Sequence, residues 1–364
     1  MKTALAGIIV LGLSVFVCAG GVEAGSGYVY ITAFPSFPVV CKVDIAKAEI
    51  VKKLKLVEDE PWEACGVFKM ANKDKLFIPL FYESKEGGTK GKSRLAIVDL
   101  KSLELDQTLD IGFNAHGFVP VPEMNKLFFY CSGSSTDDNY KLTALEFGDD
   151  MGIKSSKKVN ASFASSVWAL SGDGKLIFDT DKREASPVKV VDLAKLKQTG
   201  EIRISEELGG ISRMAACPAD DRLFALSYKY STVPRKKFFL AVDSAQGRLI
   251  KSVELNAKVM AVSPDAKNVY TAFWDADEEK ASIVSIDLDN YTIAKKLSIS
   301  DNKLGDVESI GVSSDGKYAV ILFRGYGSSA FFSPSYLVIL NIASNKIKTI
   351  EMDSMPTGLL ISQE

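Results

Sequence analysis

The sequence predicts an all-β fold, a seven-bladed β-propeller built from four-stranded antiparallel blades. Three observations favour it: one four-stranded unit recurs along the chain, its copies follow one another at nearly constant spacing, and the two ends of the chain supply complementary parts of one further copy. A fixed repeat of this length is typical of propellers, in which each unit packs only against its neighbours.

The clearest copy of the unit is residues 258–299. An apolar strand at 259–262 leads through a Ser-Pro-Asp-Ala turn to a second strand at 268–273. A third strand at 282–286 and a fourth at 292–299 complete a meander. The strands alternate with period two, and both sets of residues are largely apolar, so the sheet needs a neighbour on each face.

Five more copies are recognisable. Together with Met260 of the copy at 258–299, the equivalent first-strand positions lie roughly 46 to 51 residues apart, close to the period expected of propeller blades. These positions are Val67, Phe118, Val167, Met214, Met260 and Ile310.

The chain ends supply the seventh copy. Residues 356–362 match only the first strand of the unit, and residues 28–56 match only the second, third and fourth. We therefore expect the C-terminal strand to pair with the N-terminal blade and to close the ring.

The N-terminus has the pattern of a signal peptide. Lys2 precedes an apolar run at 4–17, and Val22-Glu23-Ala24 has small residues at the spacing of a cleavage site. Cleavage after Ala24 would leave residues 25–364 as one propeller domain, periplasmic or secreted, without a transmembrane segment. Lipidation at Cys18 is the alternative, although the preceding Val17 is larger than such sites prefer.

Composition excludes several function classes. The net charge is −2 over 364 residues, so no nucleic acid partner is expected. The single histidine, His116, rules out a His-rich metal or haem site, and no G-x-S-x-G motif occurs. The sequence therefore predicts no cofactor, no metal site and no assigned catalytic residue.

Four cysteines would remain after removal of Cys18. Buried free thiols are one expectation, since the four lie singly in different blades. If one disulfide forms, we expect it between Cys65 and Cys131, which fall near the same end of neighbouring blades.

A candidate site follows from aligning the repeats. The residue that opens each inner strand is polar or titratable in all seven units, and Arg213 lies next to one of them. A solvated channel asks only for small or polar residues, which is the structural alternative. The seven are Cys65, His116, Ser165, Ser212, Lys258, Glu308 and Thr357.

The charged members of this set point to ligand binding at the channel mouth. Lys258 and Glu308 come from adjacent blades and, with His116 and Arg213, offer a cation, a carboxylate and a titratable base around one opening. Such a set could hold a small anionic or zwitterionic ligand. It could equally be an ion pair that ties two blades together.

The loops between second and third strands lie at the same face and diverge in length and charge, as expected of a recognition surface. Phe331 and Phe332 are adjacent in one such loop. They are either exposed for a protein partner or tucked beneath a neighbouring segment.

The repeats resemble a known family. Units such as Met260-Ala-Val-Ser-Pro-Asp-Ala and Leu170-Ser-Gly-Asp-Gly-Lys are similar to those of exported bacterial YVTN-type propellers. The same superfamily includes the heavy, non-quinone subunits of amine dehydrogenases. The Tyr-Val-Thr-Asn strand is degenerate here, as Val269-Tyr-Thr-Ala. The resemblance implies the fold but no particular activity.

We expect from this an exported binding or interaction module, a monomer or a subunit of a hetero-complex, more than an enzyme. One alternative is the non-catalytic propeller subunit of a periplasmic amine dehydrogenase. A second is a propeller lactonase or hydrolase that uses Glu308, Glu63 and His116.

Overall fold

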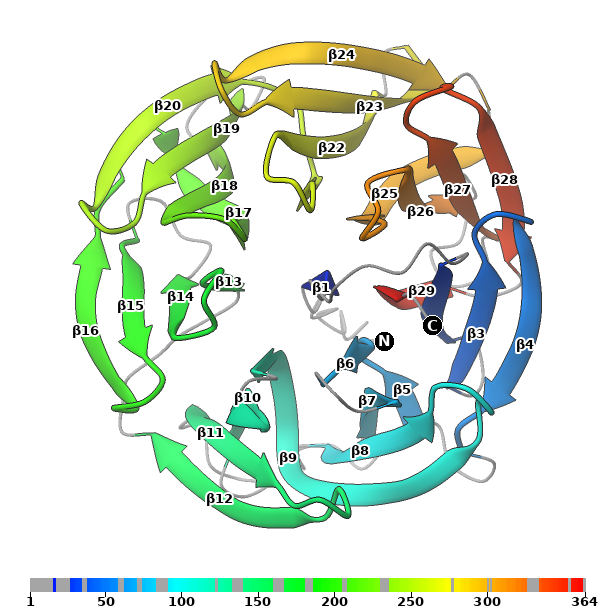
Figure 1. Ribbon diagram of the computed structural model, residues 1–364, viewed down its shortest axis with the longest axis vertical. Coiled ribbons are helices and arrows are strands. Elements are labelled where there is room, and N and C mark those ends of the chain that lie inside the picture. The colour runs from blue at the N-terminus through cyan, green and yellow to red at the C-terminus, as the bar shows by residue number, and fades with distance from the viewer. Residues whose placement is uncertain are drawn as a thin grey trace, which may run out of the picture.

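The computed structural model shows sheets arranged radially around a central axis, with first strands innermost and fourth strands outermost (Figure 1). It describes residues 16–17, 27–34, 38–57, 62–70, 74–82, 91–121, 124–132, 140–159, 167–180, 186–204, 208–229, 236–275, 278–299, 301, 303–325, 334–352 and 355–362. The all-β propeller predicted from the sequence is confirmed. None of the described elements is a helix that could cross a membrane.

In the described part of the chain, six sheets contain seven four-stranded units, because one sheet holds two of them. Blade 1 consists of β29 (Met355–Ser362), β2 (Tyr28–Phe34), β3 (Val39–Asp44) and β4 (Glu49–Lys55). Blade 2 consists of β5 (Trp62–Ala64), β6 (Phe68–Lys69), β7 (Lys75–Tyr82), β8 (Lys92–Asp99) and the first part of β9 (Leu105–Val121). Blade 3 consists of the rest of β9, β10 (Lys126–Ser132), β11 (Tyr140–Phe147) and β12 (Ile153–Val159).

The remaining blades are separate four-stranded sheets. Blade 4 is β13 (Val167–Leu170), β14 (Leu176–Thr180), β15 (Val188–Asp192) and β16 (Lys197–Ile202). Blade 5 is β17 (Gly210–Ala216), β18 (Arg222–Lys229), β19 (Lys236–Asp243) and β20 (Arg248–Glu254). Blade 6 is β21 (Val259–Val262), β22 (Asn268–Asp275), β23 (Lys280–Asp287) and β24 (Thr292–Ile299). Blade 7 is β25 (Leu304–Val312), β26 (Tyr318–Gly325), β27 (Ser335–Asn341) and β28 (Ile347–Met352).

The two ends of the chain close the ring as the repeat pattern predicts. β29 pairs antiparallel with β2, from Tyr28 opposite Ser362 to Phe34 opposite Met355. The C-terminal strand is thus the inner strand of a blade whose other three strands come from the N-terminal part of the chain.

One strand departs from the expected pattern. β9 runs for 17 residues and serves as the outer strand of blade 2 and the inner strand of blade 3. Gly112 (φ 104°) and Asn114 (φ 50°) have positive φ at the crossing point, which lets the backbone turn without ending the strand. A bent strand therefore joins the two blades.

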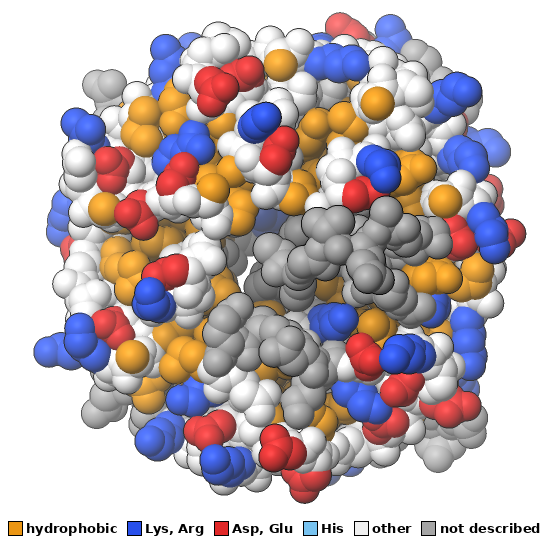
Figure 2. All heavy atoms as spheres, in the orientation of Figure 1, with side chains coloured by type: hydrophobic (Ala, Val, Ile, Leu, Met, Phe, Trp, Pro, Cys, Tyr) orange, Lys and Arg blue, Asp and Glu red, His pale blue; other side chains and the backbone are white. Residues whose placement is uncertain are grey.

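The core lies between the blades. Seven hydrophobic clusters each join two neighbouring blades, so the ring has a packed interface at every junction. At the junction of blades 5 and 6, for example, Phe224 and Phe239 pack with Val269 and Ile286. The fourth strands face solvent, and acidic and basic side chains are interspersed around the ring (Figure 2).

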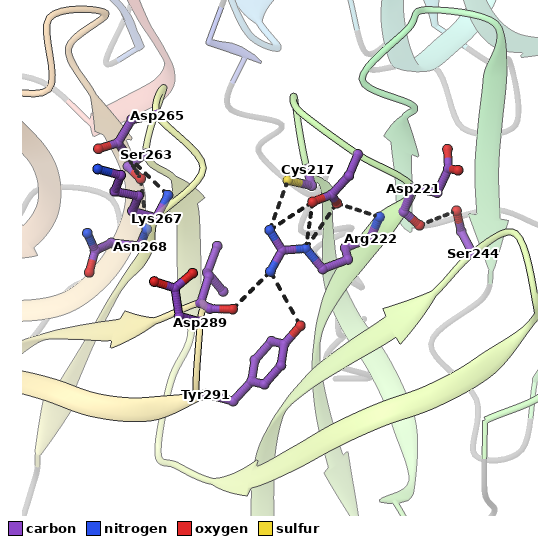
Figure 3. Close-up of polar contacts among 12 residues, drawn as sticks. Cys217, Asp221, Arg222, Ser244, Ser263, Asp265, Lys267, Asn268, Asp289 and Tyr291 are labelled. Carbon is purple, nitrogen blue, oxygen red and sulfur yellow. Dashed lines mark hydrogen bonds and ion pairs between the residues drawn. The ribbon is translucent and has the colours of Figure 1, made fainter.

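The turns between first and second strands are held by a repeated serine and aspartate. In blade 6 the Ser263 hydroxyl lies 2.6 Å from Asp265 Oδ1 and accepts the backbone N–H of Asn268 at 2.9 Å (Figure 3). Ser313 and Asp315 repeat the arrangement in blade 7. These side chains satisfy turn N–H groups that the ladder leaves open, which explains why the motif recurs in the sequence.

A short strand near the axis completes the innermost layer (Figure 1). β1 (Phe16–Val17) pairs in parallel with β29, opposite Leu360 and Ile361. The two residues of β1 fall within residues 1–24, the segment predicted to be a signal peptide.

Candidate functional site

The positions singled out in the sequence coincide with a repeated β-bulge in the inner strands. Ser212 and Arg213 share one opposing residue in β18, and Glu308 and Ser309 share one in β26. The register of β29 shifts in the same way at Thr357. A bulge turns side chains away from the regular alternation, so these positions share a distinctive direction at one end of the ring.

The other predicted positions lie at the corresponding place in their inner strands, except Ser165. His116 lies at the irregularity in β9, and Lys258 donates its backbone N–H to Ala272, the residue opposite Val259. Val167 pairs with Thr180 as Ser309 pairs with Leu322, so Ser165 precedes the equivalent position by one residue. Ser165 itself lies outside the described residues.

Charged side chains converge at this end of blades 5, 6 and 7. Glu308 Oε1 lies 2.7 Å from Arg324 Nη2, and the Glu308 side chain is only 9% exposed. Lys258, from blade 6, lies 2.5 Å from Asp306 of blade 7. We call Arg213, Lys258, Asp306, Glu308 and Arg324 the channel-mouth cluster.

Burial and charge act against each other in this cluster. Burial raises the pKa of Glu308, and Asp306 adds to that, while Lys258, Arg324 and Arg213 lower it less in total. Burial also lowers the pKa of Arg213, and Glu308 opposes that effect. Arg213 of blade 5 and Glu308 of blade 7 influence each other's pKa, which indicates that charged groups of three blades act on one another here.

His116 has different surroundings. Its Nδ1 lies 3.0 Å from the carbonyl oxygen of Asn114, and its ring stacks on Tyr130, with centroids 5.8 Å apart. Tyr130 in turn contacts Trp168 of blade 4, at 4.8 Å between centroids. Burial lowers the pKa of His116, which favours the neutral ring at pH 7. This aromatic stack is a packing arrangement between blades 3 and 4.

The remaining ring residues make bonds within the inner layer of the ring. The Ser212 hydroxyl donates to Leu226 O at 3.1 Å, and the Thr357 and Thr32 hydroxyls are 3.2 Å apart. Cys65 Sγ lies 3.7 Å from Glu63 O, and burial, aided by Glu63, raises the pKa of the Cys65 thiol to about 12. For Ser212, Thr357 and Cys65, hydrogen bonding within the inner layer explains the residue type, and no ligand is needed to explain it.

The expectation of free thiols is confirmed for Cys41, Cys65, Cys131 and Cys217, of which all but Cys65 are buried. The alternative, a disulfide between Cys65 and Cys131, is not formed. The Cys131 sulfur lies 3.1 Å from the Thr143 hydroxyl, on the neighbouring strand of its own blade. Two thiols placed singly in different blades have no reason to meet, because each blade packs by its own apolar face.

Two members of the channel-mouth cluster were not anticipated. Asp306 precedes Glu308 by two residues, and Arg324 follows Phe323, which pairs with Val307 across the hairpin. Counting across that hairpin places Arg324 opposite Asp306, two residues from Glu308. Phe331 and Phe332, the predicted partner surface, lie outside the described residues, and no cluster of metal-ligating side chains occurs in the described ranges.

Comparison with known proteins shows the fold. Neither a protein-family model nor a curated protein matches the chain. Among the solved structures, 1057 chains match, too many and too general to indicate one activity. Hydrazine synthase from Kuenenia stuttgartiensis is 13% identical with a TM-score of 0.59, over 82% of this chain and 89% of that one. Dihydro-heme d1 dehydrogenase NirN in complex with DHE is 14% identical with a TM-score of 0.60, over 94% and 77%. The chain thus shares the β-propeller fold with these proteins.

Proposed function

We propose that this protein is an exported β-propeller binding module. Its recognition surface lies at the end of the ring where the inner strands begin. The observation that carries the proposal is the channel-mouth cluster, in which three adjacent blades bring charged side chains to one end of the channel. Export rests on Lys2, the apolar run at 4–17 and the cleavage pattern at 22–24.

The energetics of the cluster support a role beyond stability. The pKa of Glu308 is raised although its carboxylate lies 2.7 Å from Arg324, so the charged form is less favourable here than in water. Perturbed groups of this kind gather at functional sites. Glu308 is therefore a residue that binding explains better than packing does.

The hydrolase alternative finds no comparable observation. Glu308 is engaged by Arg324, whereas His116 stacks on Tyr130 in another part of the ring. A dehydrogenase subunit, as the resemblance to amine dehydrogenase heavy subunits suggests, would be one form of a binding module. In that case its ligand would be a partner protein.

A thermal-shift screen tests the proposal. The protein is titrated with metals, small anions, amino acids, amines and lactones, because any ligand that binds only the native state raises the melting temperature. We expect at least one class to do so, and the rise to disappear in Lys258→Ala and Glu308→Ala. Lys267→Ala, an exposed residue in a turn between first and second strands, is the matched control.

If no small ligand raises the melting temperature, a partner protein is sought by crosslinking on the channel-mouth face. Loss of binding in Lys267→Ala alone would contradict the proposed surface.

A further inference from the structure

Arg213 occupies a position in the ring where other blades carry uncharged residues. The register of the inner strands aligns it with Val259, Ser309 and Gly358. Gly66 occupies the same place in blade 2, because it follows Cys65, whose N–H bonds to Pro79 O as the N–H of Lys258 bonds to Ala272 O. Among the described residues, a Cβ atom added to Gly66 would meet nothing within 4 Å. The inner layer is thus open at Gly66 but packed at Gly358, where an added Cβ atom would lie 2.6 Å from Gly66 Cα.

The ion pairs of the cluster leave Arg213 in excess. Lys258 is paired with Asp306, and Arg324 with Glu308. Arg213 Nη1 donates to the carbonyl oxygen of Ser212 at 3.0 Å, which uses one of five N–H donors. In the described part of the chain no carboxylate forms an ion pair with Arg213. Three cations thus face two carboxylates.

A second group in the cluster also lacks an acceptor. Within the described residues, Arg324 Nε is buried and makes no hydrogen bond. Desolvated guanidinium donors without acceptors are costly, and an anion that binds beside them would relieve that cost. Both observations indicate a ligand that accepts hydrogen bonds and carries negative charge.

Resting on the proposed function, we propose that the channel mouth binds the carboxylate group of a small organic monocarboxylate, with Arg213 as its principal donor. A planar guanidinium matches the two oxygens of a carboxylate in a forked pair. The single excess positive charge matches one carboxylate, whereas a phosphate dianion would leave the cluster negative. Lys258 and Arg324 stay paired and contribute to the positive potential around the bound group.

The test compares an acid with its uncharged amide on the full chain. Butyrate, butyramide, succinate and inorganic phosphate are titrated by calorimetry into the protein. We expect butyrate to bind more tightly than the other three. Arg213→Gln should weaken butyrate binding at least about tenfold, as loss of a charge-assisted hydrogen bond does. Arg203→Gln is the matched control, because the Arg203 side chain is 80% exposed and pairs with Glu201 in blade 4.

Each other outcome overturns the inference. Equal binding of butyramide would show that charge is not recognised, and tighter binding of phosphate or succinate would show a different ligand class. Butyrate binding that survives Arg213→Gln would place the anion elsewhere. If Arg213→Gln does not fold, Arg213→Lys keeps the charge but loses the fork, and unchanged affinity in that variant would contradict the forked pair.

The same experiment separates this inference from the proposed function. If the four probes fail but the thermal-shift screen finds a ligand that depends on Lys258 and Glu308, the carboxylate inference is wrong and the binding module stands. If neither experiment finds a ligand or partner at this face, both are wrong.

Discussion

The indole ring of Trp168, in blade 4, lies directly on the backbone of Gly117, in blade 3. A Cβ atom added to Gly117 would lie 2.6 Å from Trp168 Cε2, and the Gly117 backbone has φ 62°. Two independent constraints therefore require glycine, the left-handed backbone and the close approach of the ring. This contact joins the inner strand of one blade to that of the next.

Gly117→Ala should lower the free energy of unfolding by about 3 kcal/mol, because backbone strain and overpacking add. Gly316→Ala is the matched control: Gly316 has φ 69°, but an added Cβ there would meet nothing within 4 Å among the described residues. It should cost only the backbone part, about 1 kcal/mol. Urea unfolding of the two variants measures the difference. Equal losses would show that the indole ring moves aside freely.

The fold could be predicted from the sequence because the turns and strands of each repeat have recognisable residues. Ser263, Asp265 and their counterparts fix the turns, and the apolar second and third strands recur at a constant period. The bent strand β9 was not foreseen, since Gly112 and Asn114 ordinarily indicate a turn.

The site was foreseen only in part. Alignment of the repeats identified Lys258 and Glu308 at one equivalent position in each blade, and Arg213 beside Ser212 at that position in blade 5. The alignment alone could not show whether these residues form a cluster of interacting charges or only a layer of polar side chains along the channel. That distinction depends on Asp306 and Arg324, whose places follow from strand pairing across a bulge. The pairing of Cys65 with Cys131 failed because location at the same end of the ring does not bring two sulfurs into contact.

Glu308→Gln tests the energetics of the channel-mouth cluster. The folded-state pKa of Glu308 is raised, chiefly by burial, so the stability linked to its proton is fully present below the unfolded pKa and is lost as pH rises through the folded pKa. Glutamine resembles the protonated form and does not titrate. At pH 7 the variant should therefore be as stable as the native chain, or more stable by about 1 kcal/mol.

The measurement is urea unfolding of both proteins from pH 4 to 8, with the two stabilities expected to diverge as pH rises. Glu201→Gln, which removes the exposed partner of Arg203, should not change the pH profile in this way. A large loss of stability in Glu308→Gln at pH 7 would show that the Arg324 pair outweighs the desolvation of the carboxylate.

Arg222 joins blades 5 and 6 at the opposite end of the inner hairpins. Its guanidinium pairs with Asp220 at 2.8 Å and donates to Leu288 O at 2.9 Å and to the Tyr291 hydroxyl at 3.3 Å (Figure 3). Lysine can reach one of these partners but cannot form the fork. Arg222→Lys should cost about 2 kcal/mol of unfolding free energy. Arg248→Lys, in an exposed pair 3.8 Å from Asp243, should cost almost nothing. Equal effects would show that the contact between blades 5 and 6 does not depend on the fork.

The free thiols can be counted and ranked by reactivity. In denaturant without reductant, Cys41, Cys65, Cys131 and Cys217 should all react with a thiol reagent, because all four are free thiols. In the native protein at pH 8, Cys65 should react roughly a thousandfold more slowly than free cysteine, since its pKa of about 12 leaves almost no thiolate. Rates measured on a variant that keeps only Cys65 check this. If two of the four cysteines failed to react in denaturant, the chain would contain a disulfide.

Removal of residues 1–24 should leave the propeller intact. β29 is bonded along its length to β2, whereas β1 adds only two paired positions, opposite Leu360 and Ile361. The ring closure therefore depends on the β2–β29 pairing, and the melting temperature of residues 25–364 should equal that of the full chain within about 2 °C. The protein isolated from the exported fraction should begin at Gly25 by N-terminal sequencing.

A matched truncation of residues 355–364 removes β29 and should prevent folding, because it deletes the inner strand of blade 1. Loss of stability on removing residues 1–24 would show instead that β1 is part of the folded domain, and a start at Met1 would contradict export by cleavage.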